Sequence, residues 1–177
     1  MKKTINITFI TLLCVLLCSC GSVSPKKSAQ RDLKNYADSF SAAYSESLSD
    51  DEAESDKIAK AIVKNFSYKI GKQSIDETTA TVHVKITNTD MGQIMSDAAA
   101  KANDAVKNGE EFNAQEWLLA QMTAEDAPKT TIECDIPYVL RNGNWEIDET
   151  GDIQPLANAV SGGLYYYILG ITGTVGE

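Results

Sequence analysis

The stretch from Thr79 to Thr87 constrains the fold more than any other feature of the sequence. Apolar and polar residues alternate along it, with Ala80, Val82, Val84 and Ile86 in one set and Thr79, Thr81, His83, Lys85 and Thr87 in the other. Side chains of a β-strand point alternately to opposite faces, so the pattern predicts a strand with one buried and one solvated face. This half-buried arrangement is typical of an antiparallel sheet.

Two hairpins follow from the surrounding sequence. Ser67 to Ile75 predicts a strand that turns at Asp76-Glu77-Thr78 into the alternating one. Thr130 to Leu140 predicts another strand, and Asn142-Gly143 leads it back to the segment containing Trp145 and Ile147. Asn-Gly tolerates the positive φ angles of a type I′ turn, which makes it a strong hairpin signal. The expected inward side chains of this second hairpin are Ile132, Cys134, Ile136, Tyr138 and Leu140.

Helical spacing of apolar residues occupies the remaining segments. A long first helix is expected to bury Leu33, Tyr36, Ala37, Phe40, Ala43, Tyr44 and Leu48, and a second carries Ile58, Ala61, Ile62 and Phe66. Asp90 is expected to cap a third helix, Asn113 with Glu116 a fourth, and Pro155 to open a single last helix. The order predicts an α+β fold, with an antiparallel sheet of about four strands packed against N-terminal and inserted helices.

The N-terminus has the layout of an export signal. Basic Lys2 and Lys3 precede an apolar stretch that ends in Leu17-Cys18-Ser19-Cys20, the pattern of a lipobox. We expect residues 1–19 to be the signal, with cleavage between Ser19 and Cys20 and a diacylglyceryl group on the Cys20 thiol. Residues 20–27 would be the anchor and tether, and 28–177 a single domain on the extracytoplasmic face of the cell membrane. The alternative is an ordinary cleaved signal, and the type of envelope stays open.

Charge and cysteine content restrict the partners and the chemistry. The formal charge is −9, and loss of Lys2 and Lys3 with the signal would bring it to −11. This balance argues against nucleic acid or anionic lipid as a partner. With Cys14 and Cys18 removed and Cys20 lipidated, only Cys134 would remain, which excludes an intrachain disulfide and a thiolate zinc cluster.

Two segments carry a resemblance to a known group of proteins. The first is FSYKIGKQSIDETTATVHVKITNTDM, residues 66–91, and the second is NGNWEIDETGDIQPLANAVSGGL, residues 142–164. Both resemble parts of small Gram-positive lipoproteins with a domain of unknown function, which are similar to the cystatin-like fold of nuclear transport factor two and ketosteroid isomerase. The resemblance implies a curved sheet around helices with a cone-shaped pocket. It supplies no catalytic residue.

Few residues are candidates for chemistry. His83 is expected on the solvated strand face, and Cys134 as a small buried hydrophobe. The acidic run from Asp50 to Asp56 favours a solvated helical turn over a calcium loop, with weak cation binding left open. The uncharged stretch from Gln154 to Gly176 favours a core helix over a membrane-spanning one.

The expected function follows from an apolar inner face. Tyr138 and Cys134 would line the pocket, where only Tyr138 could donate a proton, and Tyr165 with Tyr166 would form a patch for a protein partner or a second copy. We predict a non-catalytic binding or accessory module of the cell envelope, without catalytic residues, metal or cofactor. A protein partner or a small apolar ligand is possible on this view. The alternatives are an isomerase or dehydratase that pairs Tyr138 with an unplaced acid, and a structural partner in an envelope complex.

Overall fold

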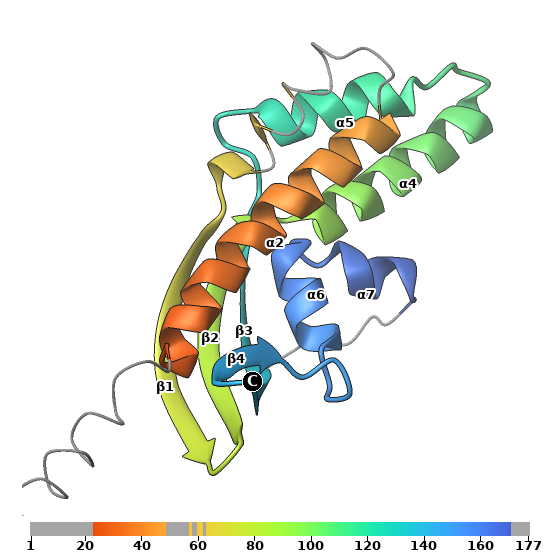
Figure 1. Ribbon diagram of the computed structural model, residues 1–177. Helices are drawn as coiled ribbons and strands as arrows, with labels where there is room; N and C mark the ends of the chain where they lie inside the picture. The colour runs from red at the N-terminus through yellow and green to blue at the C-terminus, as the bar shows by residue number, and fades with distance from the viewer. Residues whose placement is uncertain (1–22, 49–56, 58–59, 62, 171–177) are drawn as a thin grey trace, which may run out of the picture.

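The computed structural model describes residues 23–48, 57, 60–61 and 63–170 (Figure 1). The side chains of residues 40–48 are outside that description. The elements in chain order are α2 (Pro25–Leu48), β1 (Ser67–Asp76), β2 (Thr79–Thr89), α4 (Met91–Asn108), α5 (Ala114–Thr123), β3 (Lys129–Arg141), β4 (Asn144–Ile147), α6 (Gln154–Val160) and α7 (Leu164–Ile168). The α+β class is confirmed, and the two hairpins are flanked and separated by helices as predicted. Ile58 and Ile62 of the predicted second helix lie outside the described residues.

The four strands form one open antiparallel sheet in the order β1-β2-β3-β4, so the two predicted hairpins lie side by side. Asn142 and Gly143 both have positive φ, at 50° and 79°, as the hairpin signal requires. The β1–β2 register slips between Ile70 and Gln73. Gly71 lies in this irregularity, where an added Cβ would stand 3.2 Å from the imidazole of His83.

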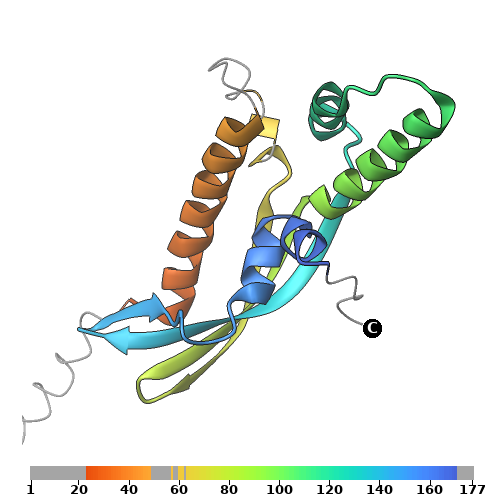
Figure 2. The ribbon, with the colours of Figure 1, turned by 90° about the vertical axis from the view of Figure 1, so that its right-hand side faces the viewer.

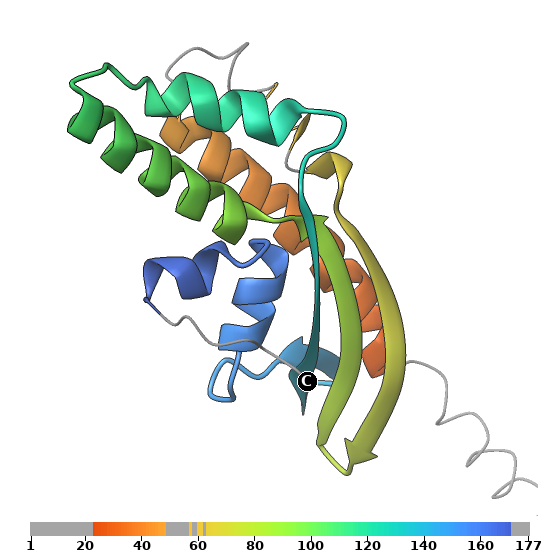
Figure 3. The ribbon, with the colours of Figure 1, turned by 180° about the vertical axis from the view of Figure 1, so that it is seen from behind.

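One face of the sheet carries the main core. α2 and α6 pack against it, while the view from behind shows β1, β2 and β3 in front of α2 with no described helix over them (Figures 2 and 3). Burying each large aliphatic side chain contributes about 1.5–3 kcal/mol, which makes this face the main source of stability. The alternation predicted from the sequence is confirmed, because the buried apolar residues of β2 and β3 are Ala80, Val82, Val84, Ile86, Cys134, Ile136 and Tyr138.

A second, smaller core lies beyond the end of the sheet, where α4 and α5 extend away from it (Figures 1 and 2). Asp90 caps α4 by accepting the N–H of Gln93 at 2.9 Å, and Gly109 ends that helix in the left-handed region. Asn113 likewise accepts the N–H of Glu116 at 3.2 Å. The predicted caps are therefore confirmed. The buried residues of this core are Met91, Ile94, Ala98, Leu118, Met122 and Leu164.

The last helix differs from the prediction, because α6 ends at Val160 and α7 begins only at Leu164. The segment from Val160 to Gly163 is here called the α6–α7 corner. Gly162 and Gly163 have φ of 60° and 84°. A Cβ on Gly162 would overlap the carbonyl oxygen of Thr89. The corner is thus pressed against the end of β2, and the helix cannot continue through backbone held in the left-handed region.

Buried polar groups fix this contact. The segment Asn88–Gly92, here called the β2–α4 junction, meets the corner through two bonds. The Asn88 amide donates to the Val160 carbonyl at 2.7 Å, and the Gly92 N–H donates to the Gly162 carbonyl at 3.1 Å. The two segments that carry the sequence resemblance therefore meet in space.

The first helix corrects two expectations. α2 begins at Pro25, which is buried, so residues 25–27, expected as part of a tether, belong to a helix instead. Proline suits a first helical turn, because its missing N–H would have no partner there. Tyr36, predicted on the core face, is 39% exposed, since Ala29, Leu33 and Ala37 form that face and Tyr36 lies beside it.

We predict that Gly162→Ala destabilises the domain far more than Gly109→Ala. Both glycines have left-handed φ, which costs a residue with a Cβ about 1–2 kcal/mol. No atom lies within 4 Å of a Cβ on Gly109, whereas at Gly162 the Thr89 carbonyl must move. We therefore expect a loss of about 3 kcal/mol or more for Gly162→Ala from combined strain and overpacking. Urea denaturation of the two variants measures the difference, and equal losses would contradict the packed corner.

Candidate functional site

Two hollows lie where α2 faces β4, α6 and α7, and Tyr36 lines both of them. The first, here called the acidic hollow, has a volume of about 360 Å³ and is lined by Arg31, Asp32, Asn35, Tyr36, Arg141, Glu146, Ile147 and Glu149. The second, here called the apolar groove, has a volume of about 290 Å³ and is lined by Tyr36, Ala157, Val160, Ser161, Leu164, Tyr165 and Ile168.

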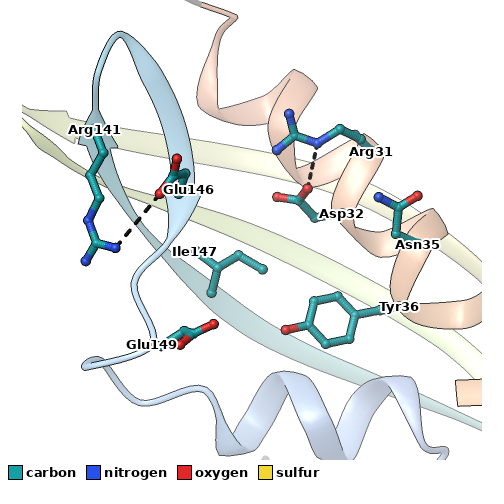
Figure 4. A pocket seen from close by; sticks show the side chains of 8 residues that line it. All are labelled: Arg31, Asp32, Asn35, Tyr36, Arg141, Glu146, Ile147 and Glu149. Carbon is teal, nitrogen blue, oxygen red and sulfur yellow. Dashed lines mark hydrogen bonds and ion pairs between the residues drawn. The ribbon is translucent and has the colours of Figure 1, made fainter. Parts of the chain in front are cut away.

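The acidic hollow has charges on both walls (Figure 4). On the α2 wall, Arg31 Nε lies 2.8 Å from Asp32 Oδ1. On the opposite wall, Arg141 lies 3.8 Å from Glu146. Glu149 has no ion pair with any residue that the structure describes. Since the lining holds three carboxylates and two guanidinium groups, it carries one net negative charge.

Asp32 also holds the hydroxyl of Tyr138. That hydroxyl donates to Asp32 Oδ2 at 3.1 Å, and Tyr138 is 1% exposed. Burial raises the pKa of Tyr138 far above its ordinary value, and the Asp32 carboxylate raises it further. The phenol therefore stays protonated, and its proton is directed to Asp32 rather than into the hollow. The acid that sequence reasoning could not place beside Tyr138 is Asp32, and the pair links α2 to β3.

The apolar groove adjoins the most exposed apolar side chains of this region. Ile168 is 70% exposed, Leu169 51% and Tyr36 39%. Tyr165 lines the groove and its ring lies 5.9 Å from that of Tyr166. Apolar side chains thus continue from the groove onto the open surface of α7.

Tyr165 and Tyr166 do not form the exposed patch that a continuous last helix predicts, because the α6–α7 corner changes the direction of α7. Both tyrosines are half-buried, and burial raises the pKa of Tyr166. Ile168, which helical spacing within a single last helix would place on the same face as Leu164, is exposed. Because the corner reorients α7, no helical period through residues 155–168 could place these side chains. Tyr36 and Ile168 line the groove only because the corner turns α7 toward α2, so no pattern in the sequence indicates that they belong to one site.

The predicted pocket residues, Cys134 and Tyr138, lie in the main core and line neither hollow. Burial raises the pKa of the Cys134 thiol to about 12, and the neighbouring Asp135 adds to the effect. Cys134 is thus an inert apolar group, as its position in the strand predicts.

His83 lies on the solvated face of the sheet, as predicted. Its Nδ1 is 2.8 Å from Asp135 and its Nε2 is 3.5 Å from Glu133. Lys85 also contacts Glu133, at 2.8 Å, and this contact lowers the pKa of Glu133. The cluster is a row of exposed cross-strand pairs, each of modest value to stability.

Several residues that the sequence singles out lie elsewhere in the chain. Ser19, Cys20 and the acidic run from Asp50 to Asp56 lie outside the described residues. Within residues 23–48, 57, 60–61 and 63–170, no group of three or more His, Cys, Asp or Glu side chains is placed to hold a metal ion. In the same part of the chain, each helix is too short or too polar to cross a membrane.

Comparison with known proteins finds no matching family model and no matching curated protein. Among solved structures, the chain is similar to a Bacillus subtilis protein described as a "putative lipoprotein (ycdA)", with 17% identity and a TM-score of 0.40. The match covers 75% of this chain and 46% of that protein, so the chain spans about half of its length. The cystatin-like fold that the sequence resemblance implies stays a prediction.

We predict that Tyr138→Phe lowers the free energy of unfolding by about 1–2 kcal/mol, because it removes a hydrogen bond to a carboxylate that is largely buried. Tyr68→Phe is the matched control, since its hydroxyl donates to the Gln30 carbonyl at 3.3 Å in an exposed position. The control should change stability by less than about 0.5 kcal/mol. Denaturant titration checks both, and a Tyr138→Phe protein as stable as the parent would contradict a structural role for the pair.

Proposed function

We propose that the chain is an exported lipoprotein, attached to the extracytoplasmic face of the cell membrane through a diacylglyceryl group on Cys20. Its α+β domain is a non-catalytic binding module, and its partner is a protein that contacts the apolar groove. The observation that carries the proposal is the groove itself, with exposed Ile168 and Leu169 beside it.

The groove supports binding because of its position. Isolated apolar residues are common on protein surfaces, whereas a hollow whose apolar lining continues onto exposed neighbours is typical of an interaction site. Here Tyr36 from α2 and Ile168 from α7 stand on the two sides of such a hollow. A partner that covers both would remove apolar area from water, which is the main driving force of association.

The ionisable side chains support a non-catalytic role. A general acid or base must reach the reacting group of a substrate. Tyr138 is enclosed and its proton is directed to Asp32, which also contacts Arg31. The isomerase or dehydratase alternative would need this pair to open into the acidic hollow. A structural partner in an envelope complex would use the same groove as the binding module.

The anchor is supported by the sequence pattern at Leu17-Cys18-Ser19-Cys20. Two acyl chains on one residue give stable membrane attachment. Because α2 begins at Pro25, a fully extended link from Cys20 reaches at most about 18 Å. The partner would therefore be bound close to the membrane surface.

We predict that Cys20→Ser prevents both lipidation and processing, since the thiol is the atom that would be alkylated. Mass spectrometry of the membrane fraction should find a mature N-terminus at Cys20 that carries two acyl chains in the parent, and an unmodified precursor in the variant. A processed variant with attached lipid would show that the anchor is elsewhere.

We predict that a photoreactive benzoylphenylalanine at position 168 forms a discrete adduct with one protein in intact cells of the native host. The matched control is position 106 on α4, because Val106 is also apolar and is 81% exposed but lies away from the groove. The adduct at position 168 should weaken when Tyr36→Ala is added. Equal adducts at the two positions, or none at position 168, would contradict the proposed binding surface.

A further inference from the structure

The apolar groove and the acidic hollow share the side chain of Tyr36, so one ligand can occupy both. The two hollows together are here called the composite site. Tyr36 lines each of them, and its ring stands between α6–α7 on one side and β4 on the other. In Figure 4 the hydroxyl end of Tyr36 points across the acidic hollow toward Ile147 and Glu149. A ligand that lies across Tyr36 would have one part in an apolar environment and the other in a charged one, separated only by the width of this side chain.

The charged part of this composite site favours a cation. Asp32 is neutralised by Arg31, and Glu146 has Arg141 nearby. Glu149 is exposed and has no ion pair within the described part of the chain. The whole chain has a formal charge of −9, which attracts cations to the molecule over longer distances.

Tyr36 itself is suited to a cation beside an apolar group. Its aromatic face can attract an ammonium or guanidinium group, and its edge packs against aliphatic side chains. The Tyr36 hydroxyl has no hydrogen bond to another described residue and is free to bind a ligand.

The size and charge of the composite site distinguish a peptide from other occupants. The groove volume of about 290 Å³ is just below the range of about 300–1,000 Å³ for small-ligand pockets, which suits one or two side chains better than a whole acyl chain. An anionic lipid headgroup would meet Glu149, and a second copy of this acidic chain would add like charge.

We propose that the partner enters this composite site with a peptide segment in which aliphatic residues adjoin a lysine or arginine. The aliphatic side chains fill the apolar groove, and the cation passes the ring of Tyr36 to pair with Glu149. This inference rests on the proposed binding function and adds the chemistry of the ligand to it.

The test uses the full chain in phosphatidylcholine nanodiscs and fluorescent synthetic peptides, with empty nanodiscs as the blank. The probe contains Leu-Leu-Lys-Lys between glycines, and the controls contain Leu-Leu-Glu-Glu or Ser-Ser-Lys-Lys. By fluorescence anisotropy we expect the probe to bind at least about tenfold more tightly than either control, since both halves of the site are needed. Probe binding should weaken as salt is added.

Point variants locate the bound peptide. Glu149→Gln should weaken probe binding about three- to tenfold and flatten its salt dependence, while Glu125→Gln, at an exposed position remote from both hollows, should leave it unchanged. Tyr36→Leu should weaken binding about fivefold or more, and Tyr36→Phe less, because only the first removes the ring. Circular dichroism melting should show that each variant remains folded.

Several results would overturn the inference. Tight binding of the Leu-Leu-Glu-Glu peptide, or probe binding unaffected by both Glu149→Gln and Tyr36→Leu, would show that this site does not select a cationic segment. Native mass spectrometry that finds dimers which exclude the probe would assign the groove to a second copy. If the probe fails while the adduct at position 168 persists, the ligand class is wrong and the binding module stands. Failure of both removes the proposed function.

Discussion

The contact between the β2–α4 junction and the α6–α7 corner determines how the rest of the molecule is arranged. It joins the Asn88 amide to the Val160 carbonyl and the Gly92 N–H to the Gly162 carbonyl. Asn88 is 1% exposed, and a buried amide left without partners costs about 1–3 kcal/mol. This cost disfavours any arrangement in which the Asn88 amide loses its hydrogen bond to Val160. It holds α6 over the sheet, where it completes the main core, and lets α7 contribute Leu164 to the second core.

The candidate site is a consequence of this arrangement. Because the chain turns at Gly162 and Gly163, α7 is directed so that Leu164 is buried while Ile168 faces solvent. The N–H groups of Tyr165 and Tyr166 are held by the side chains of Ser161 and Asn158, which fixes the start of α7. The apolar groove then forms between this short helix and Tyr36 of α2.

Some polar groups of the site are paired with other side chains, and others are not. Asp32 is engaged by both Arg31 and Tyr138, and the contact with Tyr138 connects α2 with β3. The Glu149 carboxylate has no ion pair, and the Tyr36 hydroxyl no hydrogen bond, with another residue in the described part of the chain. Both lie next to a groove that is almost wholly apolar in its lining. The resulting surface combines an apolar contact with one negative charge, and the proposal of a binding module rests on this combination.

The sequence by itself determined the α+β class, the two hairpins and the helix caps at Asp90 and Asn113. These features depend on residues close together in the chain, through alternation, turn residues and side-chain capping. The export signal and Cys20 anchor are also sequence inferences, and they stay predictions. Only the tertiary structure decided the order of the strands, the break at Gly162, and the exposure of Tyr36 and Ile168. The reason is that each depends on contacts between distant segments: Gly162 must bend because Thr89 lies against it, and Tyr36 becomes part of a site because α7 is turned toward it.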